Sequence, residues 1–230
     1  MKARINQVYK KQLNKRNLYF SIAFLALAAL FFAISFTDDF EVDDTLEIIW
    51  MFLIFFYVWL LAIYGGEIGS GFLAKQISNG LTRREAFLQM WIWSIIFSFI
   101  FYLSIIVILF CFSLAHPEIS EYVKEFIGFP VLSFICLGQV TLLIALMVKK
   151  AMNSILLGYF VFLQFEPIPA ALLSKFVNPY FVLISPHYLA KELAISNNQV
   201  DNLLQVVVIL MFTILFSFLS YRRIKKMDFI

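Results

Sequence analysis

Charged residues are scarce in this chain of 230 residues. Asp, Glu, Lys and Arg together make up 14% of the sequence, whereas apolar residues make up 62% and Phe alone occurs 28 times. Soluble domains contain roughly 25% charged and 45–50% apolar residues. A soluble domain with this composition would expose large apolar patches. The composition therefore excludes an ordinary soluble globule and predicts that lipid surrounds much of the chain.

Cysteine and histidine are also rare, and one ATP-binding motif is missing. The two cysteines, Cys111 and Cys136, lie in apolar segments, which predicts inert packing residues rather than a disulfide framework or a metal site. Both histidines, His116 and His187, lie outside the apolar runs, so the sequence lacks the intramembrane histidines of a membrane-embedded enzyme. No GxxxxGK[ST] phosphate loop occurs, so the chain does not bind ATP through that motif. We predict no catalytic residue, metal or cofactor on this chain.

Apolar runs long enough to cross a bilayer are abundant. A membrane-spanning helix needs about 20 mostly apolar residues, because the hydrocarbon core is ~30 Å thick and each residue adds 1.5 Å. The sequence predicts an all-α membrane protein with six transmembrane helices. The runs are Leu18–Phe36, Leu46–Tyr64, Trp91–Leu114, Ile127–Val148, Asn153–Phe165 and Leu203–Ser220.

Basic residues are concentrated in alternate connections between these runs. Of the 18 Lys and Arg residues, all but Lys124, Lys175 and Lys191 lie in the N-terminal arm, the second and fourth connections and the C-terminal tail. Acidic residues crowd the connections on the other side. Since cytoplasmic loops carry the excess of Lys and Arg, we expect both termini in the cytoplasm.

Two alternatives to this topology fit the sequence less well. A seventh span over Ile168–Ile184 would place Lys175 near its centre, at a cost of about 2.5–3.5 kcal/mol on insertion scales, and would move the basic C-terminal tail outside. Small residues at Ala33 and Ser35 resemble a signal-peptide cleavage site. The apolar run there is about 19 residues, whereas the core of a signal peptide is roughly 7–15. The sequence thus favours six spans with the first one retained.

Two segments outside the spans have a distinctive pattern. Residues 1–17 are basic, with apolar residues at helical spacing, and are expected to lie on the inner membrane surface, either as an amphipathic helix or simply as a basic anchor. Residues 166–202 contain four prolines but are too apolar for a hydrophilic loop. Irregular backbone at membrane depth must pack against protein or line a wet cavity. We therefore predict short re-entrant helices in the outer leaflet.

The connection between the second and third spans, residues 65–90, has the pattern of a helical elbow. Gly65 and Gly66 are expected to break or bend the second span at the cytoplasmic surface. Apolar residues four positions apart within Ile68–Ile77 favour a short amphipathic helix along the membrane face. We name residues 65–90 the elbow.

The second half of the elbow carries a turn followed by a helix start. Ser78-Asn79-Gly80 is a turn pattern. Thr82 and Glu85 have the spacing of a capping box, in which the N-cap hydroxyl and the carboxylate at the third helical position each bond the other's backbone N–H. The third span is thus expected to start in the cytoplasm, with Arg83 and Arg84 projecting from it.

The elbow resembles the cytoplasmic signature of type-2 ATP-binding-cassette exporter permeases. The resemblance is carried by Glu67, the pair Ser70-Gly71 and the run Asn79-Gly80-Leu81-Thr82-Arg83. It is supported by the layout of the chain, because that family also has an N-terminal amphipathic helix, six spans, cytoplasmic termini and an outer re-entrant pair, in this order. One difference is Met90, where family members often have Lys at the start of the third span.

The resemblance implies a function and partners. In that family the elbow is a coupling helix that docks on a separate ATPase subunit, which binds ATP and Mg. By resemblance, the docking or coupling residues are Glu67, Gly71, Thr82, Arg83 and Arg84. It further implies a second permease copy or a paralogue and a location in the bacterial inner membrane. Spans without a central charge fit an exporter whose substrate is hydrophobic or amphipathic.

Polar residues within the spans could either join helices or line a substrate path. Such residues often form interhelical hydrogen bonds worth about 1 kcal/mol each, and Gln139, Gln164 and Glu166 are alternatively candidates for a substrate path. No span has a charge at its centre, which disfavours ion-coupled transport. The alternative function is a non-transporting membrane scaffold, assembly factor or immunity factor. It explains the spans and the charge asymmetry equally well, but neither the elbow nor the apolar outer segment.

Overall fold

The structure is a computed structural model that describes residues 42–114, 130–148, 150–158, 167–185, 189 and 202–227. The predicted arm at residues 1–17 and the first predicted span lie outside the described residues. The chain divides into two compact units, Met1–Ile48 and Ile49–Ile230. The helices pack against one another within the unit Ile49–Ile230. Every element in the described part of the chain is helical.

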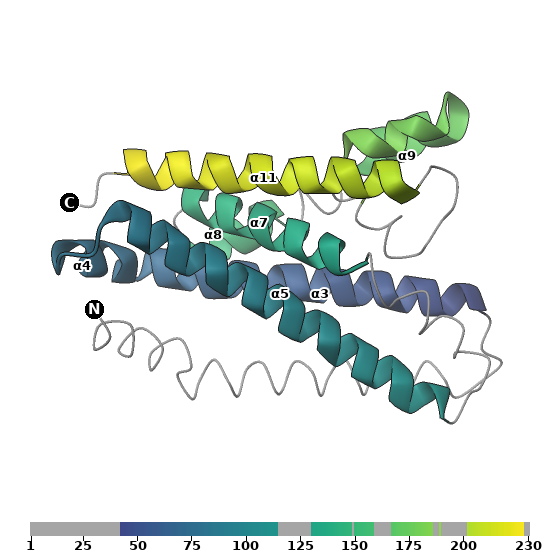
Figure 1. The fold of residues 1–230 in the computed structure, drawn as a ribbon, viewed down its shortest axis with the longest axis horizontal. Coiled ribbons are helices and arrows are strands. Elements are labelled where there is room, and N and C mark those ends of the chain that lie inside the picture. The colour runs from purple at the N-terminus through teal and green to yellow at the C-terminus, as the bar shows by residue number, and fades with distance from the viewer. Residues whose placement is uncertain are drawn as a thin grey trace. The chain divides into compact units, whose positions relative to one another are not determined.

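Four long helices dominate the described chain (Figure 1). They are α3 (Val42–Gly69), α5 (Arg83–Ser113), α7 (Pro130–Val148) and α11 (Asn202–Lys226). Shorter elements lie between them: α4 (Phe72–Ser78), α8 (Ala151–Leu157), α9 (Pro167–Phe176) and the 3-10 helix η3 (Pro179–Ile184). All four long helices overlap predicted spans.

Three of these helices, α5, α7 and α11, are long and apolar enough to cross a membrane. The apolar part of α3 together with α4 meets the same criterion as a bent pair, which raises the number among the described residues to four. The structure thus supports a helical membrane protein. The finer prediction of six spans also depends on residues outside the described part, including 18–36 and 159–165.

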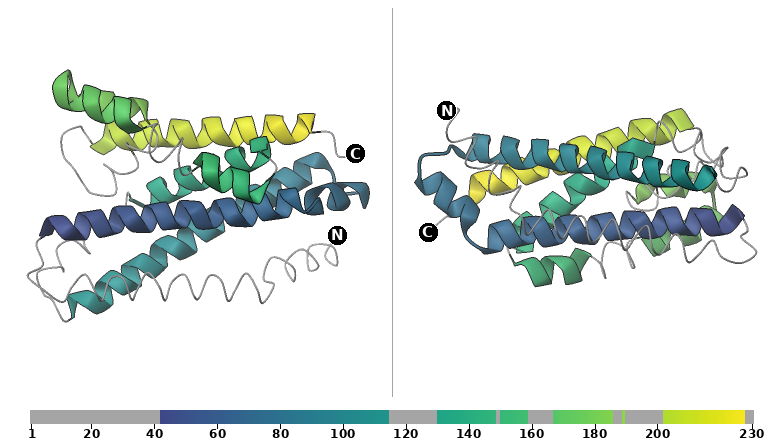
Figure 2. Two further views of the ribbon diagram at one scale, coloured as in Figure 1. Left: turned by 180° about the vertical axis from the view of Figure 1, so that it is seen from behind. Right: turned by 90° about the horizontal axis from the view of Figure 1, so that it is seen from below.

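Helix α7 lies between α5 and α11 and is the most buried of the three (Figures 1 and 2). Within the apolar 18-residue stretch of each helix, 67% of the residues are buried in α7, compared with 33% in α5 and 17% in α11. A helix that is apolar on all sides must be surrounded by other helices or lipid. Here the surroundings of α7 are the neighbouring helices, so its polar side chains face protein.

Aromatic rings hold α3 against α5 and α7. The Phe56 ring lies 4.8 Å from that of Phe101 on α5 and 5.5 Å from that of Phe134 on α7, between ring centroids. Trp59 meets Phe97 edge-to-face at 5.3 Å. Such pairs contribute about 0.5–1.5 kcal/mol each beyond the area they bury. The abundance of Phe in the sequence therefore serves helix packing here as well as lipid contact.

Of the two outcomes expected at Gly65 and Gly66, a break of the second span does not occur. Helix α3 continues through both glycines to Gly69, and the Ser70 N–H still donates to the Gly66 carbonyl at 3.0 Å. A glycine weakens a helix by only about 0.5–1 kcal/mol relative to alanine, so a helix held by tertiary packing tolerates it. The break comes four residues later, at Ser70-Gly71.

The apolar stretch Ile168–Ile184 is broken rather than continuous. It forms α9 and η3, separated at Val177 and Asn178, and the Asn178 side chain caps η3 by accepting from the Tyr180 N–H at 2.9 Å. The ten residues of α9 extend only about 15 Å. Neither element is long enough to cross a bilayer by itself, which agrees with rejecting a seventh span. A re-entrant position in the outer leaflet stays a prediction.

Candidate functional site

The elbow begins with a sharp change of direction after α3. The axis of α4 is bent by 47° from that of α3. Gly71 stands at the turn with φ of 69°, a left-handed conformation that glycine adopts without steric cost. An added Cβ would meet no atom within 4 Å, so backbone conformation rather than crowding accounts for glycine here. Gly71, a predicted coupling residue, thus sets the direction of α4.

The end of α4 is closed by a Schellman motif. The Leu81 N–H donates to the Gln76 carbonyl at 3.1 Å, and the Gly80 N–H donates to the Ile77 carbonyl at 2.9 Å. Gly80 has φ of 91°, as this motif requires of the residue after the C-cap. The turn predicted at Ser78-Asn79-Gly80 is confirmed. Both ends of α4 therefore depend on glycines with positive φ.

The predicted capping box at the start of α5 is confirmed. The Thr82 N–H and hydroxyl donate to the Glu85 carboxylate at 2.9 and 2.8 Å, and the Glu85 N–H donates to the Thr82 hydroxyl oxygen at 3.2 Å. Two backbone donors that lack partners within the helix are thereby satisfied. The first residues of α5 are fixed in position, including Arg83 and Arg84.

Replacing Thr82 with alanine is expected to lower the free energy of unfolding by about 1 kcal/mol, the usual cost of losing an N-cap. The free energy is measured by titrating the purified protein with SDS in mixed micelles. Thr82→Ser retains the hydroxyl and serves as the control, with stability close to that of the native chain. Equal stability of the alanine and native proteins would contradict the capping role.

The two arginines that follow Thr82 differ in their surroundings. An Arg83 guanidinium N–H donates to the backbone carbonyl of Lys225 in the last turn of α11. Carbonyls at a helix C-terminus lack partners within the helix, and a cation there also interacts favourably with the helix dipole. Arg84 is exposed. Arg83 therefore joins two helices, whereas Arg84 is presented to solvent.

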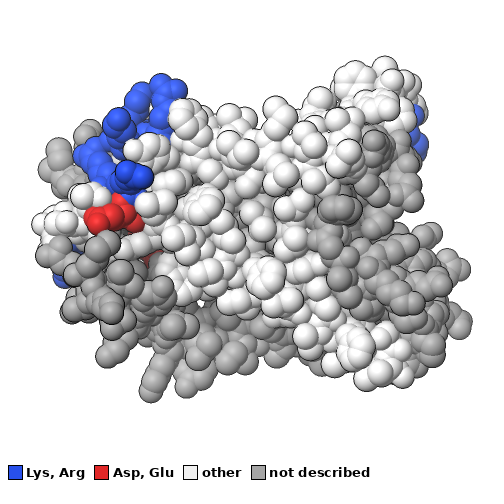
Figure 3. Space-filling view, in the orientation of Figure 1, with Lys and Arg blue, Asp and Glu red and all other residues white. Residues whose placement is uncertain are grey.

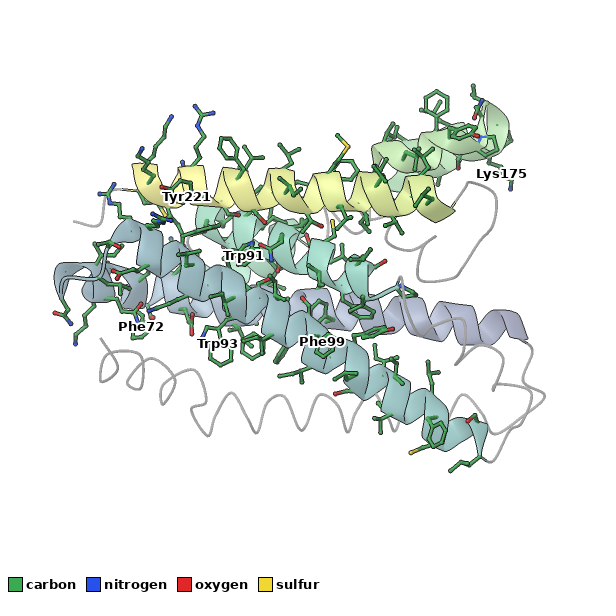
Figure 4. The ribbon with its side chains drawn as sticks, viewed as in Figure 1. Phe72, Trp91, Trp93, Phe99, Lys175 and Tyr221 are labelled. Atoms are coloured by element: carbon green, nitrogen blue, oxygen red, sulfur yellow. The ribbon has the colours of Figure 1, made fainter. Side chains whose placement is uncertain are left out.

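The contact between Arg83 and α11 is the first of three in register. Phe87 meets Tyr221 edge-to-face with 5.3 Å between ring centroids. The Trp91 indole N–H donates to the Ser217 hydroxyl at 2.9 Å. Along α5 these residues advance by four, and along α11 their partners recede by four, as antiparallel packing of two helix faces requires. Figure 4 labels Trp91 and Tyr221 between α5 and α11.

Gln139 of α7 lies at the inner end of this series. Its side-chain N–H donates to the Ser94 hydroxyl at 3.2 Å, and its side-chain oxygen accepts from Ser217 at 3.3 Å. Gln139 is fully buried. One amide thus joins α5, α7 and α11, which is the interhelical role that polar residues commonly have in membranes. A substrate path along Gln139 stays a prediction.

Gly138 allows α7 to approach α5 at the same level. A Cβ at this position would lie 2.6 Å from the Ser98 hydroxyl oxygen and 2.8 Å from that of Ser94. The Ser98 hydroxyl is shared between the carbonyls of Ser94 and Phe134, at 2.8 and 3.0 Å. Small residues at helix contacts in membranes permit such close packing. We name Trp91, Ser94, Ser98, Gly138, Gln139 and Ser217 the polar interface.

The other predicted site residues fall into two groups. Glu67 lies in the last turn of α3, where its backbone carbonyl accepts from the Ser70 hydroxyl at 3.0 Å, so it lies within the elbow. Gln164 and Glu166 lie outside the described residues. The elbow thus contains five of the predicted residues because they are near one another in sequence, namely Glu67, Gly71, Thr82, Arg83 and Arg84. Gln139 lies in the contact between spans.

Sequence reasoning did not pair the residues of the polar interface. Ser94, Ser98 and Gln139 are recognisable as polar residues in spans, but nothing local to the chain indicates which helix each one faces. Gly138 lies directly beside Gln139, and a small residue next to a polar one in a span was the available signal of a close helix contact.

Basic side chains gather where α11 ends and α5 begins (Figure 3). The exposed members are Arg83, Arg84, Arg222, Arg223, Lys225 and Lys226. Lys175 lies at the far end of the helices, on α9 (Figure 4). Comparison of the sequence with protein-family models and with curated proteins finds no match.

Proposed function

We propose that this chain is the membrane-spanning permease subunit of an ATP-driven exporter of the type-2 ATP-binding-cassette class. It has six spans, with both termini and the elbow in the cytoplasm of a bacterial cell. Two copies, or one copy and a paralogue, form the translocation path. A separate ATPase subunit binds ATP and Mg and docks on the elbow. The substrate is hydrophobic or amphipathic.

One observation supports this proposal above the others: the elbow is a separately capped structural unit attached to the long helices at both ends. Its short helix α4 begins at the left-handed Gly71 and ends in a Schellman motif. Its exit is fixed by the Thr82 capping box. A loop that merely connects two spans does not need a capping or turn motif at each helix end. A docking element needs such motifs, because its movement must be passed on to the helices that it joins.

The contacts of α5 supply a route for such transmission. A displacement of the elbow moves the start of α5 through the capping box, and Arg83, Phe87 and Trp91 connect that part of α5 to α11. Gln139 then joins both helices to α7. We propose that ATP-driven movement at the elbow shifts α5, α7 and α11 together, rather than only the two spans that the elbow connects.

The test is recovery of an ATPase with the tagged chain from its native membranes in mild detergent. The co-purifying protein must contain a GxxxxGK[ST] motif and hydrolyse ATP in the eluate. Arg84→Glu is expected to reduce its recovery by at least about tenfold, which corresponds to ~1.4 kcal/mol of binding free energy. Arg83 is not used, because its substitution would also break the bond to the Lys225 carbonyl.

Lys150→Glu is the matched control, since it reverses the charge of an exposed basic residue outside the elbow. Recovery should then equal that of the native chain. If Arg84→Glu binds as well as the native chain does, docking on this face of the elbow is disproved. If no ATPase is recovered under conditions that preserve known exporter complexes, the transport proposal gives way to a non-transporting membrane factor.

A further inference from the structure

One exposed side of α11 is apolar along most of the helix and becomes basic in the last turn. Val207, Met211, Ile214 and Phe218 are spaced by three or four residues, so they lie on one side of the helix, and all four are exposed. The next position on this stripe is Arg222, which is followed by Arg223, Lys225 and Lys226 in the last turn. All four basic residues are exposed. We name these four residues the basic turn.

The distance along the helix matches the thickness of a bilayer. About 30 Å of helix separates Asn202 from Arg222, and the hydrocarbon core of a bilayer is also ~30 Å thick. If the exposed apolar stripe lies in that core, the basic turn lies directly beyond it, in the layer that contains the lipid phosphates. Lys and Arg side chains reach that layer readily because their long stems are apolar.

We infer that the basic turn is a binding site for the headgroups of anionic phospholipids. Clusters of four to eight basic residues next to the cytoplasmic end of a span attract anionic lipids, by about 1 kcal/mol for each residue near the surface. The inference goes beyond the transport proposal and does not depend on it, because it requires only that α11 crosses a membrane.

Two other occupants fit the basic turn less well. A second copy of the chain, related by two-fold symmetry about this end of α11, would bring like charges together, which is unfavourable. An acidic protein would meet the charges but would not explain why they begin about 30 Å along α11, where its exposed apolar stripe ends. The lipid headgroup accounts for both the charge and its position.

The structure also holds the basic turn in place. The Lys225 carbonyl accepts from Arg83, and Tyr221 packs against Phe87, so the last turn of α11 is fixed to the start of α5. Arg84 follows on α5 and is exposed. A helical last turn presents its basic side chains from a fixed backbone, which reduces the conformational entropy lost when a headgroup binds.

The test is native mass spectrometry of the full chain in mild detergent, titrated with phosphatidylglycerol or with phosphatidylcholine of the same acyl chains. The native chain should bind phosphatidylglycerol at least about tenfold more tightly than phosphatidylcholine. The variant R222Q/R223Q/K225Q/K226Q should lose most of that preference. The variant R222K/R223K keeps the charge and should retain it.

Two controls make the result specific to this surface. K75Q/K150Q/K175Q removes three exposed charges elsewhere and should leave the preference unchanged. The single variants R222Q and K226Q are more conservative than the fourfold variant. Each should lower the preference for phosphatidylglycerol, but by less than the fourfold variant does. They provide the answer if the fourfold variant does not fold or inserts in a different orientation.

Three outcomes would overturn the inference. One is an unchanged preference in the single and fourfold variants, and another is an equal loss in the K75Q/K150Q/K175Q control. The third is displacement of bound phosphatidylglycerol by soluble glycerol phosphate at similar concentration, which would identify a phosphate site rather than a lipid site. None of these measurements involves an ATPase. If lipid binding is disproved, the transport proposal still stands, and if the transport proposal is disproved, the lipid site still stands.

Discussion

Replacing Gly138 with alanine is expected to lower the free energy of unfolding by about 1–3 kcal/mol, the usual range for overpacking a well-packed core. The added Cβ would lie 2.6 Å from the Ser98 hydroxyl oxygen and 2.8 Å from that of Ser94. Both serines are fully buried. The serine hydroxyls can avoid the methyl group only by rotating, which breaks the bond from Ser98 to the Phe134 carbonyl and the bond from Gln139 to Ser94. Either these buried bonds are lost or helices α5 and α7 separate.

The free energy is measured by SDS titration, and a second substitution identifies the cause. Ser98→Ala removes the nearer of the two obstructing atoms, so G138A/S98A should lose less stability than the sum of the single variants. Residues in contact commonly show coupling of 0.5–3 kcal/mol in such cycles. Strict additivity would show that Gly138→Ala acts through something other than this contact.

Gly66→Ala is the matched control for the Gly138 substitution. Both glycines lie within helices, but a Cβ at Gly66 would meet no atom within 4 Å. Alanine favours a helix by about 0.5–1 kcal/mol over glycine. Gly66→Ala should therefore leave the stability unchanged or raise it. A loss of the same size at both positions would mean that the effect does not come from helix contact.

Gln139→Leu is expected to lower the free energy of unfolding by about 1–3 kcal/mol, since two interhelical hydrogen bonds are lost and each contributes roughly 0.6–2 kcal/mol in membranes. Leucine has a similar volume and leaves little cavity. Ser217 shares its one hydroxyl proton between the Gln139 side-chain oxygen at 3.3 Å and the Thr213 carbonyl at 2.7 Å, so it keeps an acceptor when Gln139 is replaced. Part of the loss should be common to Gln139→Leu and Ser217→Ala in a double-mutant cycle, because both substitutions remove the same Ser217–Gln139 bond.

Ser104→Ala is the control for Gln139→Leu. The Ser104 hydroxyl donates to the Ile100 carbonyl, in the same helix, at 2.9 Å. Removing this hydroxyl breaks no contact between helices and should change the stability by only a few tenths of a kcal/mol. The same Gln139 variant also tests the predicted substrate path. Altered export at unchanged stability would place Gln139 on the path, whereas a stability loss shared with Ser217→Ala would assign it to helix packing.

Local signals in the sequence predicted the ends of elements well. The Thr82 capping box and the turn at Ser78-Asn79-Gly80 depend on residues within five positions of one another. The physical interactions are equally local, so the residue types alone indicate them. The long apolar runs likewise predicted helices where α3, α5, α7 and α11 lie, because the energy of apolar residues in lipid depends on composition more than on partners.

The position of the elbow's bend shows where local reasoning fails. Two adjacent glycines, Gly65 and Gly66, are a stronger breaking signal than the single Gly71, yet α3 continues through the pair. A glycine permits a break but does not require one. Tertiary packing decided between them: Tyr64 and Ile68, on either side of the pair, are buried and hold the helix in place.

By itself, the sequence determined a helical membrane protein, the places of its long helices, the capped start of α5 and the segregation of its charges. Only the tertiary structure decided that Gln139 joins three helices, that Gly138 is a contact point and that Arg83 reaches the end of α11 while Arg84 does not. The physical reason is that apolar content and capping act between near neighbours in the chain. Helix pairing depends on which side chains meet across 45 to 142 residues of sequence, and apolar spans contain little in their sequence to specify that.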